Sequence, residues 1–170
     1  MRAGVLNLDK PAGATSFDAV RRVRELTHAR RVGHAGTLDP LATGVLPILL
    51  ESATRLADFA HGLPKTYEAD VHLGFRTPTD DAETEREAVA SPAALTRQEV
   101  AAALATFVGR ITQEPPAFSA VKVDGKRAYK RARGGDLSRP EPREVEVHSV
   151  ELLDFRPGEA ATAHVMVTCA

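Results

Sequence analysis

The fold of this chain is decided by one stretch, Gly33-His34-Ala35-Gly36-Thr37-Leu38-Asp39-Pro40-Leu41-Ala42-Thr43-Gly44-Val45-Leu46. The stretch runs directly into an apolar segment that ends at Leu50. Glycine permits positive φ and close approach of a ligand to the backbone, and an ordinary loop beside a buried strand seldom needs that freedom. Pro40 biases the backbone of Asp39 away from α geometry. The stretch therefore predicts a buried strand, preceded by a loop that holds one carboxylate in a defined pose.

The candidate site residues also have ordinary structural explanations. Asp39-Pro40 is a good helix start, with Asp as the N-cap and Pro in the first helical position. His34 can be a histidine hydrogen-bonded to backbone, and Tyr67 can be a core residue of a strand. Lys10-Pro11-Ala12-Gly13 can be a simple turn. The residues alone leave these alternatives open.

Composition indicates an ordinary globular protein. A length of 170 residues predicts one domain, and the 43% hydrophobic and 26% charged fractions are those of a globular chain with a real core. Cys169, the single cysteine, excludes an intramolecular disulfide and is typical of the reducing cytoplasm. The sequence contains neither a signal peptide nor an apolar run long enough to span a membrane.

Positive charge is segregated although the net charge is −1. This pattern suits a protein that lays one face on a polyanion, but solvated helix faces are the alternative. No metal-ligand spacing, phosphate-binding loop, dinucleotide fingerprint or Ser–His–Asp arrangement is present. The first basic cluster comprises Arg21, Arg22, Arg24, Arg30 and Arg31, and the second comprises Lys122, Lys126, Arg127, Lys130, Arg131 and Arg133.

Hydrophobic periodicity predicts an α+β fold. A helix is expected over residues 16–27, capped by Thr15 or Ser16, with Phe17, Val20, Val23 and Leu26 on its apolar side. Further helices are predicted over residues 52–61 and 96–108, a polar loop over 77–92, and basic helical turns over 126–133. Strands are predicted over residues 5–8, 45–50, 67–75, 118–123, 144–155 and 161–168. Because the chain stops at Ala170, at the end of a strand, the sequence indicates a fragment.

Several motifs in order resemble the TruB family, the tRNA pseudouridine-55 synthases. The most specific is the Gly33–Leu46 stretch. The others are Asn7-Leu8-Asp9-Lys10-Pro11-Ala12-Gly13-Ala14-Thr15-Ser16, Lys65-Thr66-Tyr67-Glu68 with Leu73-Gly74, Gln113-Glu114-Pro115-Pro116-Ala117-Phe118-Ser119-Ala120-Val121-Lys122, and Gly125-Lys126-Arg127-Ala128-Tyr129 with Ala132-Arg133. The resemblance implies a mixed, mainly antiparallel sheet flanked by helices. It makes residues 1–170 one incomplete catalytic domain with an RNA-binding thumb over about residues 116–143.

The resemblance also implies an activity. These enzymes convert one uridine in the T-loop of tRNA to pseudouridine, which requires the base to be flipped into a pocket. Asp39 matches the catalytic aspartate, which either attacks C1′ or removes the 2′ proton. Tyr67 matches the tyrosine that stacks on the target base and helps to remove the proton from C5.

Further residues are implied to bind the substrate. His34 matches a histidine that meets the flipped nucleotide, and Lys10 matches a lysine that supports the pocket beside the tyrosine. Thumb residues are expected to contact RNA, namely Lys122, Arg127, Tyr129 and Arg133. The resemblance implies neither a metal nor an organic cofactor, no obligate protein partner, and a cytoplasmic monomer whose partner is the tRNA T-arm.

One departure from the family pattern bears on activity. Family members continue with a Gly-Thr-Tyr-Ile-Arg type segment, whose arginine pairs with the catalytic aspartate, and then usually with a small C-terminal RNA-binding domain. Neither is in this sequence, so the chain by itself can be inactive. Two alternatives to a stand-alone synthase stay open, namely a guide-RNA-dependent synthase subunit and a non-catalytic RNA-binding module.

Overall fold

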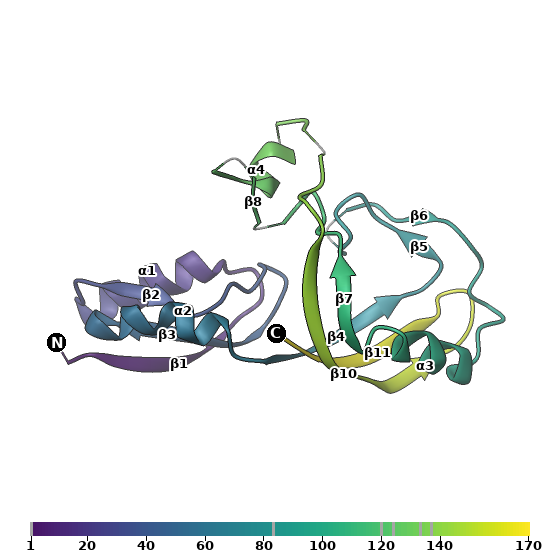
Figure 1. Cartoon of the computed structure of the whole chain (residues 1–170), viewed down its shortest axis with the longest axis horizontal. Helices are drawn as coiled ribbons and strands as arrows, with labels where there is room; N and C mark the ends of the chain where they lie inside the picture. Colours follow the sequence, from purple (N-terminus) through teal and green to yellow (C-terminus); the bar gives the residue numbers. More distant parts are fainter. Residues whose placement is uncertain (1, 83, 120, 124, 133, 137) are drawn as a thin grey trace. The chain divides into compact units, whose positions relative to one another are not determined.

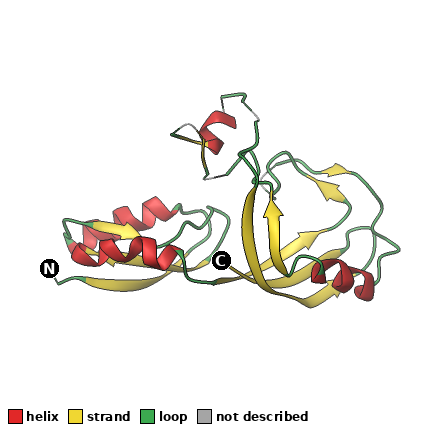
Figure 2. Cartoon of the chain, in the orientation of Figure 1, coloured by secondary structure: helices red, strands yellow, loops and turns green. Residues whose placement is uncertain are grey.

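The computed structural model describes residues 2–82, 84–119, 121–123, 125–132, 134–136 and 138–170. The chain divides into two compact units, Met1–Leu63 and Pro64–Ala170, and each is described by itself (Figure 1). Helices and strands occur in both units (Figure 2). No helix in the described ranges is long and apolar enough to cross a membrane.

The first unit is built on a three-stranded antiparallel sheet in the order β1-β3-β2. Its core lies between this sheet and α1, where Leu46 and Ile48 of the central strand meet Val20 and Val23 of the helix. The buried strand predicted after the glycine-rich stretch is confirmed as β3. The elements are β1 (Gly4–Lys10), α1 (Ser16–Thr27), β2 (Val32–His34), β3 (Gly44–Leu50), the 3₁₀ helix η1 (Glu51–Leu56) and α2 (Ala57–His61).

Helix α1 has the predicted bounds and begins with a capping box. The Thr15 hydroxyl accepts a hydrogen bond from the Asp18 amide, and the Asp18 carboxylate accepts from the Thr15 amide. Hydrogen bonds that the Thr15 hydroxyl and the Thr15 amide donate to the carboxylate lower the pKa of Asp18. The prediction that Phe17 and Leu26 face the core is wrong, because each is 64% exposed. Positions nine residues apart in an α-helix point in opposite directions. Residues repeated at every third position therefore cannot all lie on one buried face of the helix.

The helix predicted over residues 52–61 is only partly confirmed. Its first half is the 3₁₀ helix η1, and α-helical geometry begins at Ala57 and ends before Gly62. Glu51, which opens η1, has a positive φ of 52°. The left-handed conformation of Glu51 turns the chain sharply out of β3, and the helix continues from this turn.

The second unit contains a four-stranded antiparallel sheet in the order β4-β11-β10-β7. Val100 of α3 packs with Ala163 and Val165 of β11 to form its core. The predicted capping box of α3 is confirmed, since Thr96 and Glu99 exchange hydrogen bonds. The main elements are β4 (Lys65–His72), α3 (Arg97–Ala105), β7 (Gly109–Gln113), β10 (Arg143–Arg156) and β11 (Thr162–Cys169).

Several short elements differ from the sequence prediction. Helix α3 ends at Ala105 rather than Val108, because the chain turns there to begin β7 at Gly109, which has a φ of +108°. The strand predicted over residues 118–123 is reduced to β8 (Lys122–Val123). The remaining elements are β5 (Phe75–Arg76), β6 (Glu87–Ala88), β9 (Lys126–Arg127) and α4 (Ala128–Ala132).

Candidate active site

The loop between β2 and β3 presents Asp39. Its first residue is fixed to the sheet, since the Ala35 amide donates to the Pro47 carbonyl at 2.9 Å. The alternative in which Asp39-Pro40 starts a helix is excluded. Asp39 instead begins a turn closed by a 3.1 Å hydrogen bond from the Ala42 amide to its carbonyl, and Gly44, with a φ of +113°, leads into β3. The Asp39 residue is exposed on this turn.

Ser16 fastens the first turn of α1 to the same loop. Its hydroxyl donates to the Leu38 carbonyl at 3.0 Å and accepts from the Leu38 amide at 3.0 Å. Ser16 is buried, so both hydrogen bonds form away from bulk water. Leu38 directly precedes Asp39, and these bonds therefore fix the backbone beside the carboxylate.

Lys10 binds the backbone of Pro40, the residue that follows Asp39. Its side chain is 0% exposed. Its ammonium donates to the carbonyls of Pro11 at 2.9 Å, Ala14 at 2.7 Å and Pro40 at 3.4 Å. The Gly13 amide donates to the same Pro40 carbonyl at 2.8 Å. The turn after β1 and the Asp39-Pro40 turn are thus joined by one buried cation.

The position of Lys10 differs from the RNA contact that the sequence predicts for it. A fully buried ammonium has no surface to offer to a phosphate. A buried charge is tolerated only when its hydrogen bonds are satisfied, and three carbonyl acceptors satisfy the three protons of Lys10. The geometry gives Lys10 a role in positioning the loop.

His34 ends β2, opposite Ile48 of β3, and leads directly into the loop. Its ring nitrogen Nδ1 is buried and has no hydrogen-bond partner within the described part of the chain. A buried polar atom without a partner costs about 1–3 kcal/mol, and such atoms concentrate at functional sites. The interpretation of His34 as a histidine bonded to backbone finds no support at Nδ1.

Tyr67 lies in the second unit, on the edge strand β4, opposite Val167 of β11. It is 44% exposed. The interpretation of Tyr67 as an ordinary core residue is therefore wrong. An aromatic ring that is partly exposed at a sheet edge can present a face to a planar base.

The predicted thumb residues lie on small elements. Lys122 of β8 pairs with Arg127 of β9 in a hairpin, and Tyr129 lies in α4. Arg133 lies outside the described residues. Beyond α4, hydrogen bonds from Ser138 and Arg131 lower the pKa of Asp136 from 3.8 to about 2. Arg131 and Asp136 form an ion pair at 2.7 Å, which organises the chain after this helix.

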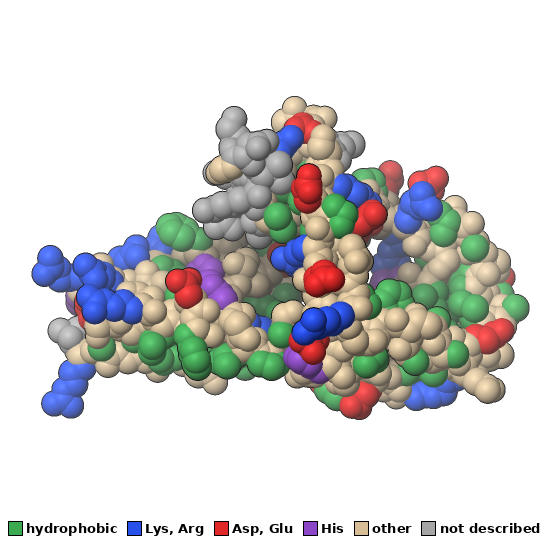
Figure 3. Space-filling model, viewed as in Figure 1, with side chains coloured by type: hydrophobic (Ala, Val, Ile, Leu, Met, Phe, Trp, Pro, Cys, Tyr) green, Lys and Arg blue, Asp and Glu red, His purple; other side chains and the backbone are tan. Residues whose placement is uncertain are grey.

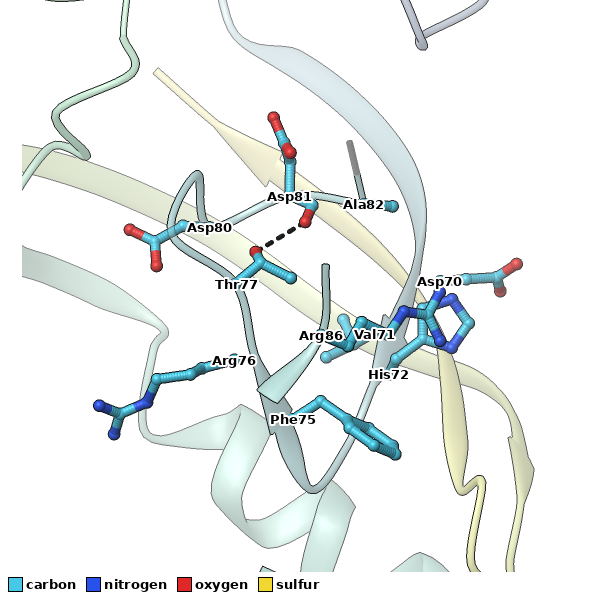
Figure 4. Close-up of a pocket in the computed structure, with 10 residues that line it drawn as sticks. All are labelled: Asp70, Val71, His72, Phe75, Arg76, Thr77, Asp80, Asp81, Ala82 and Arg86. Atoms are coloured by element: carbon cyan, nitrogen blue, oxygen red, sulfur yellow. Dashed lines mark hydrogen bonds between the residues drawn. The ribbon is translucent and has the colours of Figure 1, made fainter. Parts of the chain in front are cut away.

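A cavity of about 350 Å³ lies elsewhere in the second unit, beside β4 and β5 (Figure 4). The Thr77 hydroxyl donates to the Asp81 carbonyl at its edge, at 2.7 Å. Acidic, basic and apolar side chains line the cavity together, so its charge favours no class of ligand. Its lining residues are Asp70, Val71, His72, Phe75, Arg76, Thr77, Asp80, Asp81, Ala82 and Arg86, and none of them is a predicted site residue.

Comparison with known proteins gives the family. A family model described as TruB family pseudouridylate synthase (N terminal domain) matches residues 24–170. The chain belongs to the TruB family. A tRNA pseudouridine synthase B from Symbiobacterium thermophilum is 48% identical over 167 residues, which are 98% of this chain and 56% of that relative. Another from Bacillus anthracis is 47% identical over 172 residues, with the same two shares. The chain thus spans about half the length of the curated relatives it matches.

Solved structures show the same fold. An H/ACA ribonucleoprotein bound to a substrate RNA containing 2′-deoxyuridine includes a chain with 25% identity and a TM-score of 0.66. The match covers 98% of this chain and 37% of that one. A Cbf5-Nop10-Gar1 complex matches with 27% identity and a TM-score of 0.65, covering 97% and 39%. The predicted α+β fold of the pseudouridine synthases is confirmed.

Within this TruB-family site, the contact of Ser16 with Leu38 is the feature that sequence reasoning missed. Ser16 was expected only as a possible N-cap, a role that Thr15 fills. A serine at the start of a helix gives no sign of a partner 22 residues away. Only the fold brings the two segments together.

Proposed function

We propose that this chain carries the catalytic machinery of an enzyme that isomerises uridine 55 in the T-loop of tRNA to pseudouridine. The proposal is supported by relatives named tRNA pseudouridine synthase B. The observation that carries it is the exposed Asp39, whose two neighbours in the chain are fixed by hydrogen bonds. Lys10 binds the carbonyl of Pro40, and Ser16 binds the backbone of Leu38. Such preorganisation holds a reactive group in a productive geometry before the substrate arrives.

The reaction breaks the bond between N1 of the base and C1′ of the ribose and forms a bond from C5 to C1′. The proton leaves C5 and N1 gains one, so the product is an isomer and no oxidant or second substrate is consumed. Asp39 either forms a temporary bond to C1′ or removes the 2′ proton and later returns it. Both routes need an ionised carboxylate that reaches the ribose of a flipped nucleotide.

Other residues bind the substrate in this proposal. His34, which leads from β2 into the Asp39 loop, meets the flipped nucleotide. Tyr67 stacks on the target base and assists loss of the C5 proton. The thumb residues Lys122, Arg127 and Arg133 contribute positive charge to phosphate contacts. Lys10 acts through the loop and does not touch RNA.

A second candidate is a synthase subunit of a guide-RNA ribonucleoprotein. The solved structures favour it in part, since the matched chains belong to complexes with RNA or protein partners. Identity to those chains is 25–27%, whereas the relatives named tRNA pseudouridine synthase B reach 48%. We therefore propose a cytoplasmic monomer that acts on the T-arm without a guide RNA.

The test is to incubate the chain with an unmodified tRNA transcript and quantify pseudouridine at position 55 by nucleoside analysis. The same measurement is made with Asp39→Asn, and binding of both proteins is measured in parallel. We expect the original chain to form pseudouridine and Asp39→Asn to form none, while both proteins bind the tRNA. Binding without product from either protein calls for the same assay on a chain extended beyond Ala170, and product from neither chain would favour the non-catalytic RNA-binding module. Activity that requires a guide RNA would favour the second candidate.

A further inference from the structure

We propose that one exposed stripe of α1 is a second RNA-binding surface that guides the sugar–phosphate backbone toward Asp39. This inference rests on the proposed function. The stripe consists of Phe17, Arg21 and Arg24 of α1 and of His28, the residue that follows the helix as its C-cap, and all four residues are exposed. Steps of four and three residues keep Phe17, Arg21 and Arg24 on one line of the helix, over a length of about 10 Å.

The composition of the stripe fits RNA. Two guanidinium groups and an imidazole suit phosphates, and an aromatic ring can stack on an unpaired base. Phe17 is 64% exposed at the start of this line. Lys and Arg side chains gather at one end of the Met1–Leu63 unit (Figure 3).

The stripe begins at the end of α1 that contacts the Asp39 loop. At its beginning, Ser16 bonds to Leu38, the residue before Asp39. Near its end, the Arg24 guanidinium donates to the Val32 carbonyl at 3.1 Å, which places it beside the strand that ends at His34. In this proposal, RNA that extends from the uridine at Asp39 runs along this line of side chains.

The acidic side chains of α1 leave net positive charge on the stripe. Asp18 pairs with Arg21 at 2.8 Å, and Glu25 pairs with Arg22 at 3.6 Å. Both pairs are exposed and hence weak, so a phosphate can compete for either arginine. Arg22 lies about 100° around the helix from Arg21, which puts it off the stripe on the same element. Arg22 is thus a matched control.

The experiment measures binding of a T-arm stem-loop by fluorescence anisotropy between about 50 and 200 mM salt. The single variants Arg21→Gln, Arg24→Gln and Arg22→Gln are compared with the original chain. Removal of one phosphate contact is expected to reduce the slope of log K against log salt by about one. We expect this reduction for Arg21→Gln and Arg24→Gln, and an unchanged slope for Arg22→Gln.

A folding effect is separated from an RNA effect by two further measurements. Thermal unfolding checks each variant, and Arg24→Lys restores the charge at the position that bonds to Val32. The restored charge is expected to recover the slope. Two results would overturn the proposal that the stripe binds RNA. These are unchanged salt slopes for both stripe variants, or equal reductions of the slope for the variants of all three arginines. Pseudouridine formation by the original chain in the same samples shows separately whether the proposed function holds.

Discussion

The hydroxyl of Ser16 lies 3.0 Å from both the amide nitrogen and the carbonyl oxygen of Leu38. One small side chain thereby satisfies both backbone polar groups of the residue before Asp39. A loop needs such partners from other segments because it lacks the regular backbone hydrogen bonds of a helix or a sheet. The candidate carboxylate is therefore positioned by the start of α1 as well as by its own turn.

Ser16→Ala is expected to lower activity more than stability alone explains. Loss of the two bonds should reduce the free energy of unfolding by about 1–2 kcal/mol. Thr15→Ala removes the helix cap next to it and should cost about 1 kcal/mol, without touching the loop. The measurement is urea unfolding together with kcat on a T-arm substrate. Equal losses of kcat in the two variants would argue against a role of Ser16 in holding the loop.

Lys10→Met should be one of the most damaging single changes in the first unit. It removes the three hydrogen bonds that the buried Lys10 ammonium donates to backbone carbonyls, and hydrogen bonds to charged groups contribute about 1.5–3 kcal/mol each. We expect lower stability in urea and strongly reduced product formation even where the variant stays folded. Lys65→Met, at a lysine that is not fully buried, serves as the control. A Lys10→Met protein with the original stability and activity would contradict the bracing role.

Tyr67 variants separate the ring from the hydroxyl. If stacking dominates, Tyr67→Leu should weaken binding of the T-arm by about 1–3 kcal/mol, the usual value for one stacked base. Tyr67→Phe should keep the binding and lose rate only to the extent that the hydroxyl assists proton removal. Equilibrium binding and single-turnover rates distinguish these effects. Equal binding by all three proteins would exclude stacking by Tyr67.

The hydrogen bonds that Asp136 accepts from Ser138 and Arg131 predict a pH dependence of local structure. Because its pKa in the folded chain is about 2 against an ordinary 3.8, the carboxylate stabilises the folded form fully above pH 3.8. This stabilisation is lost as the pH falls from 3.8 through about 2. NMR titration of the Asp136 carboxyl carbon should show the low midpoint, and Arg131→Gln should raise it. A midpoint near 3.8 in the original chain would refute the pairing.

Local sequence signals predicted much of the fold. The bounds of α1 and the Thr96–Glu99 capping box follow from short-range chemistry, and both are confirmed. The exposure of Phe17 could not be predicted, because a spacing of three residues resembles a buried face over a single turn only. Strand β7 was missed because its pairing with β10 is a long-range contact between residues 30 to 38 positions apart.

The candidate site shows the same division. Motifs pointed to Asp39 and His34, and the structure places both around one loop. Burial of Lys10 and the contact between Ser16 and Leu38 depend on how the turn after β1 meets that loop, which no local pattern encodes. Tyr67 was correctly placed on a strand, but its exposure depends on β4 being a sheet edge.

Tritium release from a T-arm stem-loop labelled at C5 of uridine 55 tests the central claim most directly. The chain is used in excess over RNA, with Asp39→Asn as the control. Release by the original chain and none by the variant is the predicted result, since C5 loses its proton only when the base is rejoined through carbon. Release that persists in Asp39→Asn would contradict the assignment of Asp39 as the catalytic group.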